Sequence, residues 1–355
     1  MSTKICFTGG GSIGHVAVNL ALIPYFQSQN YDCFYIGSHK GIEQEMIKEL
    51  ENVPYYPISS GKLRRYFDWK NFSDPFKVIK GLGDAYRILR KQKPALVFSK
   101  GGFVSVPVVM AARLLKIPVL LHESDVTPGL ANKIAIRYAD HIFTTFPQAA
   151  ASLPKDKASV VGSIIRPELF QGQSQEGLAM TGLNHDKPII LIMGGSLGSQ
   201  LLNQAVRQSL DSLLQSYHIV HLTGKGLVDP SFNQAGYVQY EFVTDALSHL
   251  LAASDYIVSR AGSNAIFEFL ALKKPMLLIP LSKGASRGDQ VLNAAYFQEV
   301  GYAQVLMEED LTNEHFIQAI NNLVASSPDI LKAMNQYTHS YTIPDIYNMI
   351  IQHIK

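Results

Sequence analysis

The stretch Lys4-Ile-Cys-Phe-Thr-Gly-Gly-Gly-Ser-Ile-Gly14-His15 decides the fold, because it recurs 184 positions later as Pro188-Ile-Ile-Leu-Ile-Met-Gly-Gly-Ser-Leu-Gly198-Ser199. Each copy runs from an apolar strand through a glycine loop into a helical pattern. A second pair follows in the same order, Val97-Phe-Ser-Lys100-Gly-Gly102 and Ile257-Val-Ser-Arg260-Ala-Gly262. Short apolar runs that alternate with helices are typical of buried parallel strands. The sequence predicts an α/β protein with two Rossmann-like, doubly wound domains facing each other across a cleft.

The length of 355 residues supports two domains, since a domain typically has roughly 100 to 200 residues. We place the first domain at residues 1–162 and the second at 188–342. Between them, residues 163–187 are rich in Gly, Gln and Ser and lack a sustained period, so we expect a linker there. The tail, about 343–355, has apolar residues at helical spacing, and this pattern allows it to pack on either domain.

The composition excludes several classes of protein. With 47% hydrophobic and 17% charged residues the chain is too apolar to be disordered. The longest apolar stretch, Pro107 to Leu121, is broken by Arg113 and Lys116, so we expect no transmembrane segment. The N-terminus runs straight into a strand-like segment without the features of a signal peptide. Two cysteines in predicted strands, Cys6 and Cys33, fit a reducing cytoplasm.

The first glycine loop is a candidate anion site. Gly9, Gly11 and Gly14 match G-x-G-x-x-G between a strand and a helix, where backbone amides and the positive helix end can face a phosphate. A dinucleotide site also needs an acidic residue at the end of the second strand, and Tyr35 to Lys40 offer none. We therefore favour a nucleotide diphosphate held by one domain. The alternative is a tight strand–helix turn that binds no ligand.

His15 is a candidate general base. It follows the loop in the first helical turn, where the positive end of the helix dipole is expected to lower the pKa of an imidazole and keep it neutral at pH 7. A general base typically contributes about 10²- to 10⁴-fold to a rate. The alternative is that His15 only caps or braces the loop.

The second domain carries polar residues after two predicted strands. Ser259 to Asn264 follow the strand at 256–258, at the carboxyl edge where open α/β sheets bind ligands. In the helix that follows, Glu268 can accept hydrogen bonds from two ribose hydroxyls or simply complement the helix dipole. The segment from Leu281 to Gln290 offers amide and carboxylate groups suited to sugar hydroxyls. A sugar nucleotide fits these groups.

Ordered blocks along the whole chain carry a family resemblance. They are Gly10 to His15, Phe98 to Phe103, His122 to Asp125, Gly129 to Lys133, Val161-Gly162 with Arg166, Gly194 to Gly198, and Arg260 to Glu268. On these blocks the chain resembles the MurG family, N-acetylglucosaminyltransferases that convert lipid I to lipid II in peptidoglycan synthesis. The resemblance implies a GT-B fold, with the acceptor bound by the N-terminal domain and UDP-N-acetylglucosamine (UDP-GlcNAc) by the C-terminal one. It also implies that the tail helix returns to the first domain.

The resemblance also implies site residues. Those on the donor side are Arg166, Ser196, Phe242, Val243, Ser263, Asn264, Ala265, Ile266, Glu268 and Gln290. Those at the acceptor loops are Gly11, Ser12, Ile13, Gly14, Lys100, Gly101, Gly102 and Asn132. The catalytic candidates are His15, Asp125 and Glu123. Many relatives have Thr and Gly where this chain has Ser12 and Ile13, and Asn where it has Asp125, so Asp125 is expected either to orient the base or to bind the acceptor sugar.

The implied reaction is an inverting displacement that forms a β-1,4 bond. The C4 hydroxyl of N-acetylmuramic acid attacks the anomeric carbon of the donor and UDP leaves. The sequence contains no Asp-x-Asp. We therefore expect helix amides and Arg166, rather than a protein-held metal, to meet the charge on UDP, and we expect no cofactor.

A basic segment suggests a membrane surface. Residues 61–100 contain eleven Lys or Arg and three Asp, a net charge of +8, whereas the whole chain carries +2 and the remainder therefore −6. Aromatic residues interleave with these cations. We predict reversible binding to the anionic cytoplasmic face of the cell membrane through six residues: Lys62, Arg64, Arg65, Tyr66, Phe67 and Trp69. The apolar residues at helical spacing from Leu82 to Leu89 are expected to pack in the core of the domain instead.

Other partners and functions follow from the same residues. Nucleic acid is a weaker partner for the basic segment, because no recognised binding motif accompanies it. Cell-wall synthesis and division proteins are candidate partners by resemblance. Two rival functions are a UDP-sugar epimerase of the same architecture, which has no lipid acceptor, and a non-catalytic nucleotide-binding protein.

Overall fold

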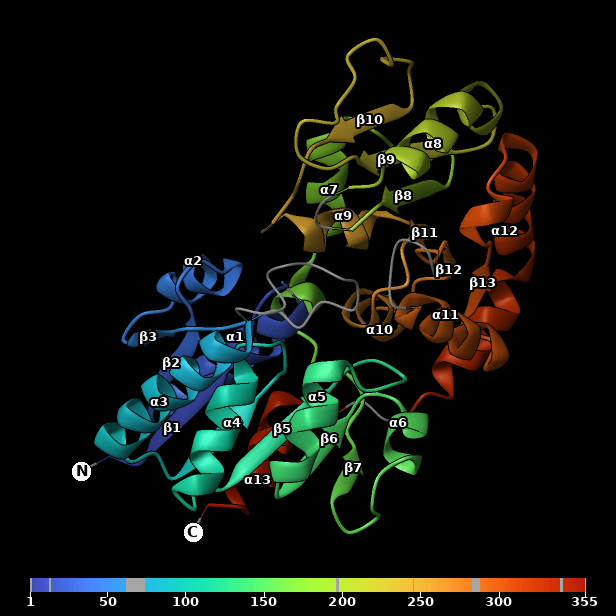
Figure 1. The fold of residues 1–355 in the computed structure, drawn as a ribbon. Helices are drawn as coiled ribbons and strands as arrows, with labels where there is room; N and C mark the ends of the chain where they lie inside the picture. The colour runs from blue at the N-terminus through green and yellow to red at the C-terminus, as the bar shows by residue number, and fades with distance from the viewer. Residues whose placement is uncertain are drawn as a thin grey trace. The chain divides into compact units, whose positions relative to one another are not determined.

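The chain folds into two compact α/β units (Figure 1). The computed structural model describes residues 2–12, 14–61, 74–195, 198–244, 246–282, 288–338 and 341–354. The first unit contains the described residues up to Ile164 together with those from Tyr341 onward, and the second runs from Ile165 to Thr338. The end of the chain therefore returns to the first unit.

In the first unit the described residues form a seven-stranded sheet in which every neighbouring pair is parallel. The strand order is β3-β2-β1-β4-β5-β6-β7. The strands are β1 (Lys4–Thr8), β2 (Asp32–Ser38), β3 (Tyr55–Ile58), β4 (Leu96–Ser99), β5 (Val119–Glu123), β6 (His141–Thr144) and β7 (Ala158–Val160).

Helices cover both faces of this sheet, because successive strand residues point to opposite sides and both sides are apolar. Ile5 and Phe7 of β1 pack with α1 (Gly14–Ser28), α2 (Ile42–Lys48) and the tail helix α13 (Ile343–Ile351). Cys6, between them in sequence, packs with α3 (Asp74–Gln92), α4 (Ser105–Leu114) and α5 (Leu130–Ala135) on the other face. The remaining short helices are η2 (Ile136–Tyr138) and α6 (Pro147–Ala151).

The second unit repeats this plan with six parallel strands among its described residues, in the order β10-β9-β8-β11-β12-β13. The strands are β8 (Ile189–Met193), β9 (His218–Leu222), β10 (Tyr237–Tyr240), β11 (Tyr256–Ser259), β12 (Met276–Leu278) and β13 (Ala303–Val305). The helices are η3 (Pro167–Gln171), α7 (Ser174–Thr181), α8 (Gln200–Leu213), α9 (Leu247–Ala253), α10 (Ser263–Ala271), α11 (Asp289–Glu299), η4 (Glu308–Asp310) and α12 (Asn313–Asn335). The prediction of two doubly wound α/β sheets is confirmed.

The segment 163–187, which we expected to be a linker, contains η3 and α7 instead. Gly177 of α7 lies so close to α9 that a Cβ atom there would sit 2.3 Å from the carbonyl oxygen of His249. From Ile165 onward the segment belongs to the second unit. The sequence pattern missed it because α7 is short and its apolar residues show little helical periodicity.

Two absences hold for the described part of the chain. None of its helices combines the length and the apolar character that crossing a lipid bilayer requires. No group of three or more His, Cys, Asp and Glu side chains is clustered there in a way that could hold a metal ion.

Candidate functional site

In the first unit the loops after β1 and β4 touch each other. The amide of Gly10 donates a hydrogen bond to the carbonyl of Gly101 at 3.2 Å. Gly102 has φ +84°, and a Cβ atom there would lie 2.1 Å from the carbonyl oxygen of Gly10, so only glycine fits. The predicted acceptor loops around Gly11 and Gly101 are therefore brought together, whereas Ile13 lies outside the described residues.

His15 lies at the start of α1, half-buried, with its ring turned back onto the loop. Its Nδ1 is 3.1 Å from the carbonyl oxygen of Gly10 and 3.2 Å from the hydroxyl of Ser12. Because a carbonyl oxygen can only accept, Nδ1 carries a proton in this contact, and Nε2 is the nitrogen that can accept one. The loop thus holds the orientation of the His15 ring through Nδ1.

Lys100 is buried beneath these loops, with only 1% of the residue exposed. Its ammonium group donates a hydrogen bond to the hydroxyl of Ser124 at 2.7 Å. Burial lowers the pKa of Lys100 to about 8, although the nearby carboxylates of Glu123 and Asp125 act in the opposite direction. Lys100 therefore ties the loop after β4 to the loop after β5 instead of reaching into solvent.

Glu123 braces the loop that follows β5. It is buried, and its carboxylate accepts hydrogen bonds from the amide of Asp125 at 2.9 Å, the side chain of Asn132 at 2.8 Å and the amide of Gly129 at 3.3 Å. Burial and the charge of Asp125 raise the pKa of Glu123, while these hydrogen bonds and Lys100 lower it. Glu123 therefore holds the turn that carries the half-buried Asp125, and Asn132 in turn holds the carboxylate of Glu123.

Two buried residues of the first unit were not among the predicted site residues. His122 is buried, and neither of its ring nitrogens has a hydrogen-bond partner among the described residues. Burial and then the charge of Lys100 lower its pKa, so the ring is neutral. Glu43, from the first turn of α2, accepts a hydrogen bond from the amide of Gly11 at 3.2 Å. The sequence around Glu43 does not indicate this contact, because Gly11 lies 32 residues away along the chain.

In the second unit the equivalent buried cation is Arg260. Its guanidinium donates to the hydroxyl of Ser199 at 2.7 Å, pairs with Glu308 at 2.5 Å and donates to the carbonyl of Ile279 at 3.1 Å. Ser199 in turn caps α8 by accepting the amide of Leu202 at 3.3 Å. Partial burial raises the pKa of Glu308, but hydrogen bonds from Ser282 and Arg260 outweigh it and hold the pKa below its usual value.

Two predicted donor residues that are distant in sequence come together. The guanidinium of Arg166 lies 3.5 Å from the carboxylate of Glu268 on α10. Burial raises the pKa of Glu268, and the charge and hydrogen bond of Arg166 oppose that rise. The pair places a cation beside a carboxylate near the N-terminal turn of α10, where the positive end of the helix dipole favours anions.

The remaining donor candidates fall into three groups. Ser263, Asn264 and Ala265 form the first turn of α10. The side chain of Ile266 is fully buried and its amide donates to the carbonyl of Gly262, so Ile266 belongs to the core rather than to a surface that a ligand can contact. The side chain of Gln290 accepts a hydrogen bond from the amide of Leu281 at 3.0 Å. Phe242, which is exposed, and Val243 follow β10. Ser196 lies outside the described residues.

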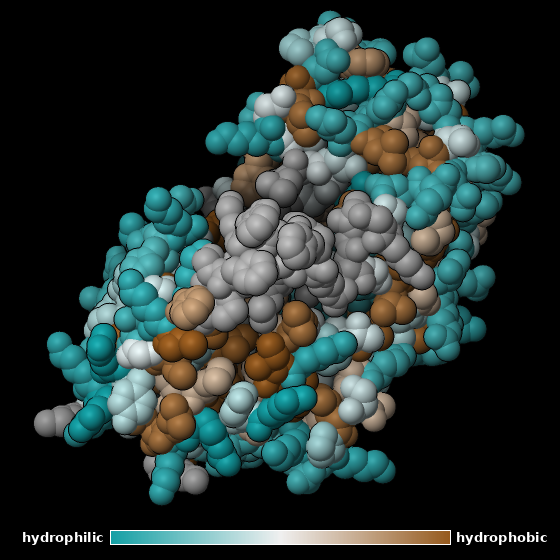
Figure 2. All heavy atoms as spheres, in the orientation of Figure 1, coloured by the Kyte–Doolittle hydropathy of each residue, from teal (hydrophilic) through white to brown (hydrophobic). Residues whose placement is uncertain are grey.

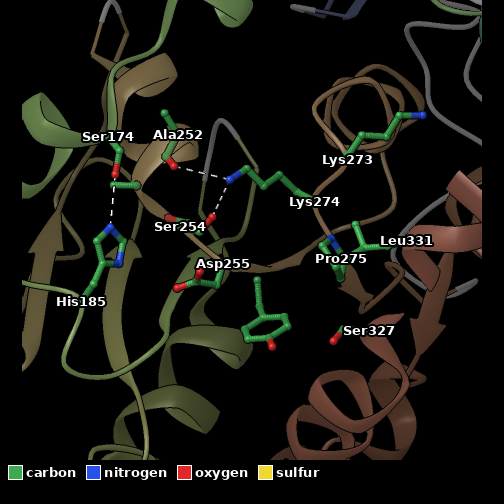
Figure 3. A pocket seen from close by; sticks show the side chains of 12 residues that line it. Ser174, His185, Ala252, Ser254, Asp255, Lys273, Lys274, Pro275, Ser327 and Leu331 are labelled. Atoms are coloured by element: carbon green, nitrogen blue, oxygen red, sulfur yellow. Dashed lines mark hydrogen bonds between the residues drawn. The ribbon is translucent and has the colours of Figure 1, made fainter. Parts of the chain in front are cut away.

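A pocket of about 290 Å³ lies at the opposite edge of the second sheet, before β11 and β12 (Figure 3). In it the ammonium of Lys274 donates to the carbonyls of Ser254 and Ala252, at 2.6 and 3.5 Å. The hydroxyl of Ser174 and the ring of His185 are 3.2 Å apart. Because these polar groups pair with one another and lie at the amino ends of the strands, the pocket is separate from the candidate donor residues.

The stripe along α3 divides into an exposed and a buried part. Phe76 and Ile79 are 74% and 66% exposed, whereas Ala85 and Leu89 are fully buried. Figure 2 shows apolar surface over the part of the first unit where α3 and α4 lie. The six residues predicted to bind a membrane, Lys62, Arg64, Arg65, Tyr66, Phe67 and Trp69, lie outside the described residues.

Comparison with known proteins defines the class. Residues 5–144 match the N-terminal domain of glycosyltransferase family 28, and residues 189–348 match its C-terminal domain. The fold is similar to that of CalG4, the calicheamicin glycosyltransferase, with a TM-score of 0.73 and 13% identity over 99% of this chain and 98% of that one. The two parallel sheets and these matches define a glycosyltransferase with the GT-B fold.

Closer relatives define the family. The chain is 55% identical over 350 residues, 98% of each protein, to the UDP-N-acetylglucosamine–N-acetylmuramyl-(pentapeptide) pyrophosphoryl-undecaprenol N-acetylglucosamine transferase of Staphylococcus epidermidis. Its structure is similar to that of Acinetobacter baumannii MurG, with a TM-score of 0.77 and 24% identity over 99% of this chain and 100% of that one. The chain belongs to the MurG family.

Proposed function

We propose that this chain transfers N-acetylglucosamine from UDP-GlcNAc to lipid I, the undecaprenyl-diphosphate-linked N-acetylmuramyl pentapeptide, and so forms lipid II of peptidoglycan. The observation that carries this proposal is the 55% identity over 98% of both chains to a transferase whose name states this donor group and this acceptor. The two α/β units supply a candidate set of groups for each substrate.

The donor is assigned to the second unit. In this proposal Glu268 accepts hydrogen bonds from the ribose hydroxyls, and Arg166 and the first-turn amides of α10 face the diphosphate. The 3.5 Å pairing of Arg166 with Glu268 supports it, because it holds both side chains beside that turn. As the glycosidic bond breaks, negative charge grows on UDP, and fixed amides and a cation stabilise this charge without having to reorganise.

The acceptor is assigned to the first unit, with His15 as the base. The oxygen at C4 of N-acetylmuramic acid forms a bond to the anomeric carbon, the bond from that carbon to the UDP oxygen breaks, and the hydroxyl proton passes to Nε2 of His15. The contact of Nδ1 with the Gly10 carbonyl supports this role, since it leaves the basic electron pair on Nε2. Asp125, on the turn that Glu123 braces, is assigned to orient the base or bind the acceptor sugar.

Incubating the purified protein with radiolabelled UDP-GlcNAc and a lipid I analogue tests the function. We expect label to move into the lipid product with release of UDP. If the donor is epimerised and no labelled lipid forms, the chain is an epimerase. If the protein binds UDP-GlcNAc and no product forms, the chain is a nucleotide-binding protein without this activity. Either result contradicts the proposal.

We also propose that the first unit binds reversibly to an anionic membrane surface, where a lipid-linked acceptor is found. The exposed apolar side chains of Phe76 and Ile79 support this site, because they lie on the α3 helix that carries Lys77 and Lys80. A surface that combines cations with exposed apolar groups binds anionic lipid through charge attraction and apolar burial together.

A further inference from the structure

The carboxylate of Glu43 occupies a place that a phosphate would be expected to take. Its Oε2 accepts the amide of Gly11, in the middle of the first glycine loop, at 3.2 Å. Its Oε1 accepts the amide of Ser38 at 3.1 Å and the hydroxyl of Ser38 at 2.5 Å. Glu43 is fully buried, so this carboxylate belongs to the interior of the unit.

The backbone around Glu43 is shaped to receive it. A Cβ atom added to Gly10 would lie 2.5 Å from the carboxyl carbon of Glu43, and one added to Gly41 would lie 2.1 Å from its oxygens. Both glycines therefore leave room for this side chain. The hydroxyl of Tyr35 also donates a hydrogen bond to the loop, to the carbonyl of Gly9 at 2.9 Å. Two buried side chains of the same unit, Glu43 and Tyr35, therefore hold the loop.

We propose that Glu43 is a positioning residue of the transfer reaction that acts as an internal anion for the first glycine loop. By accepting the Gly11 amide it fixes the loop that orients His15 and Ser12, and its charge excludes phosphate from that amide. One backbone N–H offers one hydrogen, and a second anion brought to it would face a like charge at contact distance. The acceptor diphosphate is then met by groups other than the amide of Gly11.

This inference rests on the proposed function only where kcat is measured, because pyrophosphate binding can be measured without any transfer activity. The test is Glu43→Gln, which keeps the shape of the side chain and removes its charge, with Glu45→Gln as the matched control because Glu45 is exposed on the same helix. Inorganic pyrophosphate is titrated by calorimetry into the full-length protein in the presence of saturating UDP, so that the donor site is already filled. Transfer kinetics are measured in parallel.

For Glu43→Gln we expect saturable binding of pyrophosphate at least about tenfold tighter than in the unmodified protein, since the repelling charge is gone. We expect kcat to fall about 10- to 100-fold, the range for losing hydrogen bonds to a charged group, with KM for UDP-GlcNAc unchanged. The control Glu45→Gln should match the unmodified protein in both measurements. A residue that served only folding would lower the melting temperature without creating an anion site.

Equal pyrophosphate binding by the unmodified protein and Glu43→Gln would overturn the proposal, and so would an unchanged kcat in a folded Glu43→Gln protein. If Glu43→Gln does not fold, Ser38→Ala takes its place, because it removes one donor and loosens the carboxylate. Because the charge remains in Ser38→Ala, we expect pyrophosphate binding as in the unmodified protein and a smaller fall in kcat, and an unchanged kcat or tighter pyrophosphate binding would overturn the proposal. Failure of the unmodified protein to transfer sugar would remove the proposed function but leave the pyrophosphate result intact.

Discussion

The glycine loop after β1 and the glycine loop after β8 occupy equivalent places in the two units, and different side chains hold them. At the last position of the repeat the first loop has His15 and the second has Ser199. Ser199 caps its helix and accepts a hydrogen bond from the buried Arg260, whereas the His15 ring turns back onto its loop. The backbone motif therefore sets only a strand–turn–helix geometry.

The charge placed against each loop also differs. The second loop has the cation Arg260 against its final residue, and the first has the carboxylate of Glu43 against Gly11. Arg260 is also paired with the carboxylate of Glu308, whereas the carboxylate of Glu43 accepts hydrogen bonds from two amides and a hydroxyl. The fuller glycine pattern therefore contacts a carboxylate of its own unit. The proposal that the second unit holds the nucleotide diphosphate rests instead on the pairing of Arg166 with Glu268 on α10.

The largest effect is expected where a buried charge pair holds the second loop. Arg260→Ala should lower the free energy of unfolding by about 3 to 5 kcal/mol, because it leaves the carboxylate of Glu308 with one partner fewer in a mostly buried place. Urea unfolding followed by circular dichroism measures this loss. The control is Arg113→Ala, whose exposed pair with Asp140 at 3.8 Å should contribute less than about 1 kcal/mol. Equal losses would show that the second loop does not depend on its buried cation.

The second test substitutes the two residues at the same position of the repeat. His15→Ala should lower kcat by at least about 100-fold with little change in donor KM, because the base is lost. Ser199→Ala should leave kcat nearly unchanged and cost about 0.5 to 2 kcal/mol of stability, the usual contribution of a helix cap. Steady-state kinetics and thermal unfolding measure the two effects. An unchanged kcat for His15→Ala would remove that residue from the mechanism.

A third test addresses the donor residues of the second unit. Glu268→Ala should raise KM for UDP-GlcNAc by about tenfold or more with a smaller effect on kcat, because the ribose hydroxyls lose a charged acceptor. Glu299→Ala, an exposed carboxylate of α11, is the matched control and should change neither constant. Initial rates at varied donor concentration give both values. The ribose role fails if only kcat moves.

The buried cation of the first unit gives a pH test. The pKa of Lys100 is about 8 in the folded protein and 10.5 in an exposed lysine. Between these values the unfolded chain holds a proton that the folded protein has lost, so the free energy of unfolding rises with pH. We expect the free energy of unfolding of the unmodified protein, relative to that of Lys100→Met, to rise by about 1 to 3 kcal/mol between pH 8 and 10.5. Lys133→Met, at an exposed lysine of α5, is the control, and a flat difference for Lys100→Met would contradict a lowered pKa.

The smallest effect is expected at the surface. Replacing Phe76 and Ile79 together with Ser should weaken binding to phosphatidylglycerol vesicles by about tenfold, because two exposed apolar groups no longer enter the lipid. Replacing Leu201 and Leu292 of the second unit, each 43% exposed, should have no effect. Vesicle sedimentation measures both. If the two pairs behave alike, the membrane site is not at the start of α3.

The sequence by itself determined the repeated α/β plan and the family. The repeated plan follows from local patterns, because apolar runs followed by glycine loops give parallel strands and their turns, and polar residues that follow such strands gather at the carboxyl edge. The family was indicated by resemblance, in ordered blocks from Gly10 to Glu268. The same patterns placed His15 at the start of a helix, because His15 directly follows the glycine loop. These conclusions need only neighbours along the chain.

Only the tertiary structure decided what those residues touch. The return of Glu43 to Gly11, the burial of Lys100 against Ser124 and the packing of α7 on the second unit join residues that are distant in sequence. Such contacts depend on where the folded backbone leaves room, as at Gly10, and on which buried polar groups still need a partner. No periodicity or spacing encodes them, so the charge beneath each glycine loop became visible only in the folded protein.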